Sequence, residues 1–380
     1  MIKILLLIDY SSEFDRKLLR GLVQYSKENG PWLFYRLPSY YSAMHGEQGI
    51  LRWAKEWKAD AIIGQWNNDT IDLQKELNIP VVLQNYHHRS VTYSNLTGDY
   101  KGTGRMAAQF FAKRMFRNFA YFGVKGVVWS DERCEGYRQE VKRIGGEFFS
   151  FESDKQEDEI RMEVSQWLQQ LPKPVALFCC DAHALFISET CKMTNIPIPE
   201  EIALLGVDND ELMCNISDPP ISSIELEVER GGYSIGRLIH QQIKKEHEGT
   251  FNIVINPIRI ELRQSTEKHN IKDPYILEVV KYIESHYSSD LTIESLLANI
   301  PLSRRNFEVK FKNALNTSIY QYILNCRCNH LADLLLTTDR PLADLAMEVG
   351  FTDYNNIARI FKKFKGCSPI EYRQKKTRQR

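Results

Sequence analysis

A short segment near the C-terminal end of the chain gathers hydrogen-bonding and cationic side chains on one side of a predicted helix. Asn355, Arg359 and Lys362 occupy that side, with Tyr354 near the start and Lys363 on the flank. Amide, hydroxyl and guanidinium groups can bind the edges of DNA bases, and ammonium groups can bind phosphates. The pattern points to contact with nucleic acid, although a solvated basic face on an ordinary helix pair has the same composition.

Two short helices with facing apolar stripes must hold this segment. In each helix, apolar residues recur at the spacing i, i+3, i+4, i+7 and form a stripe. The first stripe is Leu342, Leu345, Ala346 and Val349, and the second is Ile357, Ile360, Phe361 and Phe364. Each helix can bury its stripe against the other across a turn at Gly350. This spacing predicts a helix-turn-helix whose second helix enters a DNA major groove.

A weaker copy of the pattern lies upstream, over residues 291–315. Ser303 is placed to cap the second helix of this copy. A long helix over residues 319–336 is predicted between the two copies. Two reading helices tied by one rigid helix suit two successive major-groove segments on one face of DNA.

These motifs resemble the DNA-binding domain of the arabinose-regulator (AraC/XylS) family over about residues 277–373. The resemblance rests on Gly350-Phe351, Asp353, Arg359, Phe361-Lys362-Lys363, Gly366, Pro369 and Tyr372-Arg373. It implies an all-α domain with two helix-turn-helix motifs. It also implies two sets of DNA-contacting residues, Arg305, Asn306, Glu308, Val309 and Lys312 in the first motif, and Tyr354, Asn355, Arg359, Lys362 and Lys363 in the second. Val309 stands where the family often has Arg, so base readout by the first motif should depend on Arg305.

The charge of the chain is unevenly distributed. It has 49 basic and 49 acidic residues, yet residues 271–380 hold 17 Lys or Arg against 12 Asp or Glu. The remainder is therefore acidic overall. This asymmetry suits a DNA-binding tail on a body that does not itself bind DNA.

The first 266 residues alternate predicted strands and helices. Strands are expected at residues 2–8, 32–37, 61–64, 80–84, 119–123, 147–151, 175–180 and 202–208. Alternation of this kind favours parallel sheets, and the number of units exceeds one compact sheet. We therefore expect a two-lobe α/β domain over residues 1–266, a linker over 267–275 and the DNA-binding domain over 276–380.

Motifs of cofactor binding and catalysis are weak or absent from the sequence. Gly102-Thr-Gly104 fits a nucleotide loop only loosely, because no strand directly precedes it, and a helix start is the expected reading. No Gly-x-Ser-x-Gly, phosphate-binding loop or His-Glu-x-x-His occurs. The eight cysteines and nine histidines lack metal or redox spacing. We expect a protein without enzymatic activity, metal or cofactor.

No apolar run is long enough to span a bilayer. The first residues, which end in Asp9, are too short and become acidic too early for a signal peptide and read as a strand. The expected location is the cytoplasm.

Several predicted strands end in polar or aromatic groups, which favours a ligand site. In open α/β lobes, ligands bind at the carboxyl ends of strands. Gln65-Trp66 follow one strand and Asp208-Asn209 another. Sugars need charged or amide groups for their hydroxyls and aromatic faces for their C–H surfaces. Trp66 and Trp129 could be such faces, and for Trp66 plain packing is an equal alternative.

A second resemblance covers residues 1–266, to the effector domain of lactose-repressor-type regulators and periplasmic sugar-binding proteins. It rests on Asp99-Tyr-Lys-Gly102, Phe122-Gly123, Arg133-Cys-Glu-Gly136-Tyr137, Cys180-Asp181-Ala182, residues 196–209 and Pro219-Pro-Ile-Ser-Ser-Ile224. In that family, Arg and Asp at the positions of Arg133 and Asp208 bind sugar hydroxyls. The resulting candidate set is Asp15, Arg16, Gln65, Trp66, Trp129, Arg133, Asp181, Asp208 and Asn209. Cys180 replaces an amide or small polar residue.

The order of the two domains resembles that of the xylose operon regulators, including the Phe14-Asp15-Arg16 segment. The resemblance implies a dimeric activator of pentose-use genes that binds operator DNA, works with RNA polymerase and responds to D-xylose or a related pentose. Three alternatives remain, which are a repressor of the same design, a regulator for another pentose or hexose, and an enzyme body fused to a DNA reader.

Overall fold

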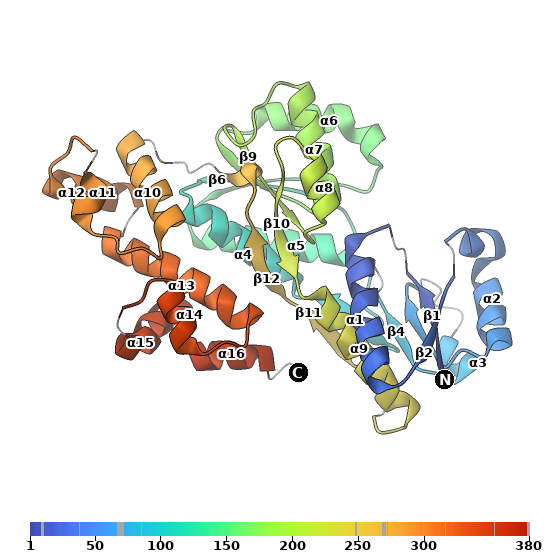
Figure 1. The fold of residues 1–380 in the computed structure, drawn as a ribbon. Helices are drawn as coiled ribbons and strands as arrows, with labels where there is room; N and C mark the ends of the chain where they lie inside the picture. Colours follow the sequence, from blue (N-terminus) through green and yellow to red (C-terminus); the bar gives the residue numbers. More distant parts are fainter. Residues whose placement is uncertain are drawn as a thin grey trace. The chain divides into compact units, whose positions relative to one another are not determined.

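The computed structural model describes residues 1–8, 11–37, 39–66, 72–84, 86–247, 249–267, 271, 273–298, 300–315, 317–352 and 354–377. It contains two compact units, Met1–Lys268 and His269–Arg380. Figure 1 shows the elements of each unit. Within the predicted linker, residues 268–270 and 272 lie outside the described residues.

The first lobe of the N-terminal unit is built on a six-stranded parallel sheet with the order β11-β5-β4-β3-β1-β2. The strands are β1 (Ile2–Leu7), β2 (Trp32–Arg36), β3 (Ala61–Gly64), β4 (Val81–Leu83), β5 (Ser94–Gly98) and β11 (Asn252–Ile255). Its helices are α1 (Glu13–Asn29), α2 (Ser39–Trp57), α3 (Leu73–Leu77) and α9 (Val228–Ile243).

The second lobe has a six-stranded sheet with the order β12-β10-β9-β8-β6-β7, parallel except for the β10–β12 pair. The strands are β6 (Asn118–Val124), β7 (Glu147–Ser153), β8 (Val175–Phe178), β9 (Ile202–Val207), β10 (Ser222–Leu226) and β12 (Pro257–Glu261). The helices are α4 (Tyr100–Lys113), α5 (Val128–Arg143), α6 (Glu157–Gln170), α7 (Asp181–Met193), α8 (Glu211–Ile216) and the short η1 (Gln264–Thr266).

The two sheets confirm the expected two-lobe α/β architecture. All eight predicted strands are present. Continuous apolar runs such as β8 and β9 made them recognisable in the sequence, because parallel strands are buried on both faces, and both strands are buried along their whole length. The prediction missed β5, β10, β11 and β12. In β5 the polar side chains are nonetheless buried, because partners satisfy them, as when the Asn95 amide donates to the side-chain oxygen of Asn252 at 3.0 Å.

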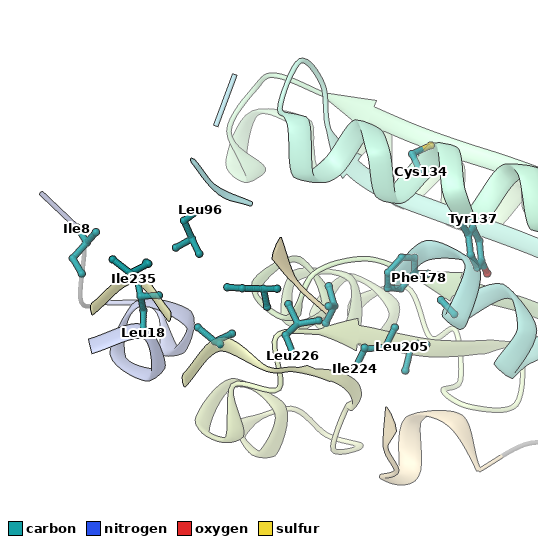
Figure 2. Close-up of a cluster of buried hydrophobic side chains, with 14 of the residues drawn as sticks. Ile8, Leu18, Leu96, Cys134, Tyr137, Phe178, Leu205, Ile224, Leu226 and Ile235 are labelled. Carbon is teal, nitrogen blue, oxygen red and sulfur yellow. The ribbon is translucent and has the colours of Figure 1, made fainter. Parts of the chain in front are cut away.

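The chain passes between the lobes three times, from β5 to α4, from β10 to α9 and from β11 to β12. Backbone hydrogen bonds tie these crossings together, from Asp99 N to Ile255 O at 2.9 Å and from Glu227 N to Asn256 O at 3.0 Å. An apolar core runs along both lobes, as Figure 2 shows from Leu18 in the first to Phe178 in the second. The crossings therefore form a continuous hinge region.

Close packing of α4 on α5 explains the glycine-rich segment that starts α4. Asp99 caps the helix by accepting a hydrogen bond from Gly102 N. A Cβ at Gly104 would lie 2.1 Å from the backbone oxygen of Arg133, so only glycine permits this approach. The segment is a helix start, as expected. Its Gly104 lets the backbone of α4 approach the backbone of α5 at Arg133.

The C-terminal unit is entirely helical. It contains α10 (Pro274–His286), α11 (Ile293–Leu297), α12 (Arg304–Leu315), α13 (Ile319–Thr337), α14 (Leu342–Glu348), α15 (Tyr354–Lys365) and α16 (Pro369–Thr377). The two predicted apolar stripes meet in one buried cluster that includes Leu345, Ile357 and Phe361. Both helix pairs and the long α13 agree with the sequence prediction.

Candidate ligand site and nucleic-acid interface

Arg133 is the centre of the candidate ligand site. It lies on α5 with 4% of its surface exposed, and its Nη2 donates to Asp208 Oδ1 at 3.3 Å. The guanidinium carbon is 5.4 Å from the ring centres of both Tyr100 and Trp129. Among the described residues no acceptor reaches the buried Nε of Arg133. The site therefore holds a buried cation with a hydrogen-bond donor to spare.

Asp208 and Asn209 follow β9 in a strained turn. Their φ angles are 103° and 48°, in the region that residues other than glycine seldom adopt. Burial raises the pKa of Asp208, and the positive charge of Arg133 opposes that rise. Asn209 is held at both ends, because its N–H donates to Ser223 Oγ at 3.0 Å and its Oδ1 accepts from Arg263 at 3.0 Å.

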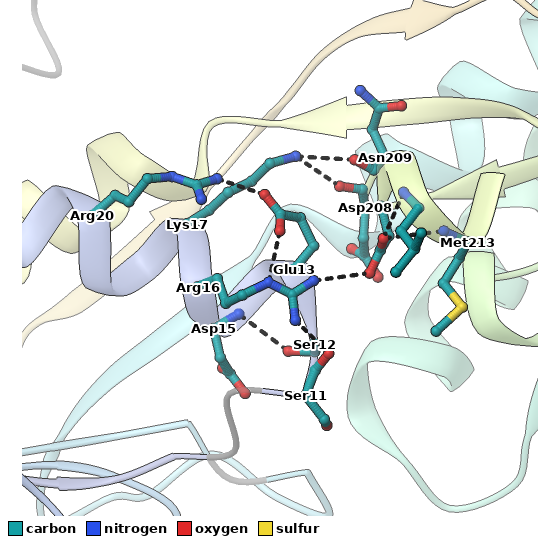
Figure 3. A network of polar contacts seen from close by, with 12 residues as sticks. Ser11, Ser12, Glu13, Asp15, Arg16, Lys17, Arg20, Asp208, Asn209 and Met213 are labelled. Atoms are coloured by element: carbon teal, nitrogen blue, oxygen red, sulfur yellow. Dashed lines mark hydrogen bonds and ion pairs between the residues drawn. The ribbon is translucent and has the colours of Figure 1, made fainter. Parts of the chain in front are cut away.

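The first lobe reaches this turn through α1. Figure 3 shows Lys17 extended toward it, with Nζ donating to the carbonyl oxygens of Asp208 at 3.1 Å and Asn209 at 3.2 Å. One step earlier on the helix, Arg16 Nη2 lies 3.4 Å from Asp210 Oδ2. Because α1 belongs to the first lobe and the turn to the second, these contacts join the two lobes next to the candidate site.

A second link joins the lobes at Glu132, which precedes Arg133 on α5. Arg89 binds both carboxylate oxygens of Glu132 at 2.6 and 2.8 Å, and Val128 N donates to Tyr86 O at 2.7 Å. The sequence reasoning missed Lys17 and Arg89. No local pattern identifies either one, since each partner is remote in the sequence.

Asp181 sits beneath the turn and holds it in place. Its Oδ2 accepts from the backbone N of Asp210 at 2.7 Å, and its Oδ1 accepts from Ser223 Oγ at 2.6 Å. The Cys214 thiol donates to the same Oδ2 at 3.5 Å. With 3% of its surface exposed, Asp181 uses both oxygens inside the protein. Burial raises its pKa to about 7.

Cys180 precedes α7 and contacts a histidine of the same helix. Its Sγ lies 2.8 Å from His183 Nδ1, and the His183 ring stacks on Trp129 with ring centres 6.5 Å apart. Burial raises the pKa of the Cys180 thiol to about 12, so the thiol is neutral. Next to Arg133, the site therefore contains a neutral thiol and an indole ring, both in contact with the His183 imidazole.

The remaining first-lobe candidates lie in different surroundings. Trp66 is 4% exposed and packs in an apolar cluster with Leu73 and Leu83. Asp15 is buried on α1, where its N–H donates to the capping Ser12 Oγ at 3.1 Å. Gln65 is half-buried directly after β3, and its N–H donates to Leu7 O at 2.9 Å. The structure thus brings Arg16, Trp129, Arg133, Asp181, Asp208 and Asn209 together and seats Trp66 in the core.

The helix-turn-helix candidates are exposed wherever their side chains are described. Arg305, Asn306, Glu308, Val309 and Lys312 lie on the exposed side of α12, with Val309 52% exposed, and Arg359, Lys362 and Lys363 lie on that of α15. The side chains of Tyr354 and Asn355 lie outside the described residues. Lys363 Nζ donates to Gln321 Oε1 at 2.8 Å, which joins α15 to α13. Two basic or polar helix faces are therefore open to a partner.

Comparison with protein families separates the same two parts. Residues 108–266 match the periplasmic binding protein-like domain, and residues 296–375 match a helix-turn-helix domain. The xylose operon regulatory protein of Escherichia coli (strain K12) is 24% identical over 385 residues, covering 98% of this chain and 96% of the relative. That of Haemophilus influenzae is 24% identical over 386 residues and covers 98% of both chains. This chain is therefore similar to the xylose operon regulators over nearly its whole length.

Solved structures agree in fold. The xylose-binding transcription activator xylR superposes with a TM-score of 0.60 at 22% identity, covering 98% of this chain and 97% of the other. The cellobiose complex of the transcriptional regulator CelR superposes with a TM-score of 0.58 at 18% identity, covering 70% of this chain and 84% of the other. Together with the two family matches and the full-length relatives, the two domains are those of a sugar-responsive transcriptional regulator, as both resemblances implied.

Two further findings concern the described residues only. Within them, no helix has the length and apolar character needed to cross a membrane. The same residues contain no group of three or more His, Cys, Asp or Glu side chains arranged to hold a metal ion.

Proposed function

We propose that this regulator binds D-xylose or a related pentose between the two lobes of its N-terminal unit, with Arg133 as the central contact. The carrying observation is the buried Arg133 guanidinium, which is paired with Asp208, flanked by two aromatic rings and left with an unpartnered Nε. An unsatisfied buried donor costs free energy, which a bound hydroxyl would recover. Tyr100 and Trp129 supply aromatic surfaces of the kind that pack against sugar C–H groups.

The other candidate ligand residues divide into two roles in this proposal. Trp129, Arg133, Asp208 and Asn209 contact the sugar, and Arg16 approaches from the first lobe. Asp181 supports the turn that carries Asp208, because both of its oxygens are engaged there. The names of the relatives, which regulate a xylose operon or bind xylose, support a pentose over other sugars.

The mechanism follows from the contacts that join the lobes. Lys17 and Arg16 from α1 bind the turn that carries Asp208, and Arg89 from the loop after β4 binds Glu132 on α5. A sugar that touches both lobes stabilises the arrangement in which these contacts form, and so shifts the population of lobe arrangements. In a dimer this shift changes how the paired DNA-binding units are presented to the operator.

The proposal extends to the partners and location of the protein. The protein acts in the cytoplasm as a homodimeric activator that binds operator DNA through α12 and α15 and works with RNA polymerase. It is not an enzyme, and it takes no metal or organic cofactor besides the effector sugar.

Calorimetric titration of the purified chain with D-xylose, L-arabinose, D-ribose and D-glucose tests the effector. Saturable heat with D-xylose and no conversion of the sugar supports the proposal. Tighter binding of another sugar in the panel reassigns the effector, and turnover of any sugar supports an enzyme body instead. Transcription from an operator-bearing promoter with and without the sugar separates an activator from a repressor.

A further inference from the structure

Gln84 presents an unsatisfied acceptor at the carboxyl end of β4. The residue follows Leu83, and its backbone N donates to Gly64 O at 2.9 Å. Its side-chain Oε1 is shielded from solvent, and no donor among the described residues reaches it. Buried amide oxygens without a partner are rare and costly in folded proteins. Gln84 was not among the residues singled out from the sequence.

Tyr86 and His87, which follow Gln84 in the chain, contact the second lobe at the start of α5. The carbonyl oxygen of Tyr86 accepts a hydrogen bond from Val128 N at 2.7 Å. The next side chain, His87, lies 3.0 Å from Gly126 O through its Nδ1. Val128 directly precedes Trp129, an aromatic residue of the candidate site. The hydrogen bond between Tyr86 and Val128 therefore joins the segment after Gln84 to the segment that carries Trp129.

Each lobe thus holds a buried polar atom for which the described residues supply no partner. Arg133 Nε is a donor in the second lobe, and Gln84 Oε1 is an acceptor in the first. A sugar carries hydroxyl groups, each of which accepts and donates, so one polyhydroxy molecule can satisfy both atoms. Gln84 as a whole is half-buried, and it directly follows β4 at the carboxyl end of the first-lobe sheet, where ligands of open α/β lobes bind.

We propose that Gln84 is a specificity-determining residue of the first lobe, whose Oε1 accepts a hydrogen bond from one hydroxyl group of the effector sugar. The inference rests on the proposed function, since it names the first-lobe partner of the sugar held by Arg133. It also gives D-xylose a hydrogen-bond partner in the first lobe besides those in the second, and contact with both lobes is the condition for a sugar to stabilise a particular lobe arrangement.

Gln84→Met tests the inference, because methionine keeps the length of the side chain and removes the acceptor. Calorimetric titration with D-xylose should show about tenfold weaker binding, the change expected for one neutral hydrogen bond. The melting temperature of the sugar-free variant should stay the same or rise, since an unsatisfied buried oxygen has been removed. Gln84→Leu provides a second apolar variant if the methionine side chain packs poorly.

Gln242→Met is the matched control. Gln242 also has a buried Oε1 that no described donor reaches, but it lies near the C-terminal end of α9. Val228, at the other end of this helix, adjoins a crossing between the lobes, and the helix separates the two by about 20 Å. The control should therefore bind D-xylose as tightly as the wild type does.

Monodeoxy derivatives of D-xylose identify the hydroxyl group. The derivative that lacks the group bound by Gln84 should bind the wild type about tenfold more weakly than D-xylose does, and should bind Gln84→Met as tightly as D-xylose binds that variant. Equal D-xylose affinity of the wild type and both Gln84 variants overturns this inference and leaves the proposed function standing. A wild type that binds no sugar in the panel overturns the proposed function, and this inference with it.

Discussion

Arg133 Nη2 and Asp208 Oδ1 lie 3.3 Å apart, although 75 residues separate them in the sequence. The side chain of Arg133 is 5% exposed and that of Asp208 is 26% exposed, so the pair is only partly shielded from water. The separation is long for a charge-assisted hydrogen bond. A ligand hydroxyl that binds either group would therefore compete with only a weak contact, and five predictions follow from this site and from the helix-turn-helix unit.

Arg133→Ala and Asp208→Asn should each weaken D-xylose binding by about 1.5–3 kcal/mol, the range for hydrogen bonds to charged groups. DNA binding without sugar should survive in both. The measurement is the melting temperature with and without xylose. Arg143→Ala serves as control, because Arg143 also forms an ion pair on α5 but with Glu140. If the pair served only to hold the lobe together, both variants would melt lower and keep the full xylose-induced shift.

Arg359→Ala should weaken specific operator binding by about 1–3 kcal/mol without unfolding the chain. Arg359 lies on the exposed side of α15, opposite the buried Ile357 and Phe361, and is placed to reach a base edge or phosphate. Fluorescence anisotropy at fixed salt measures the change. Lys281→Ala removes an exposed charge from α10 and calibrates the general electrostatic contribution. Unchanged operator affinity would remove Arg359 from the contact set.

The half-site read by α12 should be less stringent for G·C at the position facing Val309. An isopropyl group can touch a thymine methyl group but cannot form the paired hydrogen bonds that select guanine. Val309 is 52% exposed, so it is available for such contact. Selection of binding sites from random DNA checks this expectation, and a strict guanine requirement at that position would contradict it.

Gly350→Ala should loosen the second helix-turn-helix. Gly350 has a φ of +91°, and a Cβ there would lie 2.7 Å from Ser288 O. The backbone conformation alone costs about 1–2 kcal/mol with a side chain present. Hydrogen exchange of α14 and α15 in the full chain should speed up accordingly. Gly366→Ala, at φ +78° with no atom within 4 Å of the added Cβ, should have the smaller effect.

Titration of Asp181 should lower the free energy of unfolding as the pH rises from about 4 to 7. Its carboxyl would titrate near pH 3.8 when unfolded, whereas burial raises its pKa to about 7 in the folded chain. Between these values the folded state binds more protons, so a rising pH favours unfolding. Melting temperatures at pH 5 and pH 8 should therefore differ less in Asp181→Asn than in the wild type. Equal differences would mean that the three hydrogen bonds to Asp181 keep it ionised throughout.

Local patterns were sufficient to predict the DNA-binding unit. The apolar spacing of Leu345 and Ala346 on α14, and of Ile357 and Phe361 on α15, predicts both helices and the faces that they bury. Gly350 marks the turn because its positive φ favours glycine. These features depend on residues within one or two helical turns of each other, so a sequence displays them directly.

The sequence alone determined the two-lobe alternation and the long α13, and its resemblance to lactose-repressor-type regulators pointed to Arg133 and Asp208 as candidate ligand contacts. Only the tertiary structure decided which polar groups are already satisfied. In the folded chain, Asp181 accepts hydrogen bonds beneath the turn, and Trp66 packs in the core. Arg133 Nε and Gln84 Oε1 have no partner among the described residues. The physical reason is that hydrogen bonds of this kind join side chains remote in the sequence, and no periodicity along the chain encodes which donor meets which acceptor.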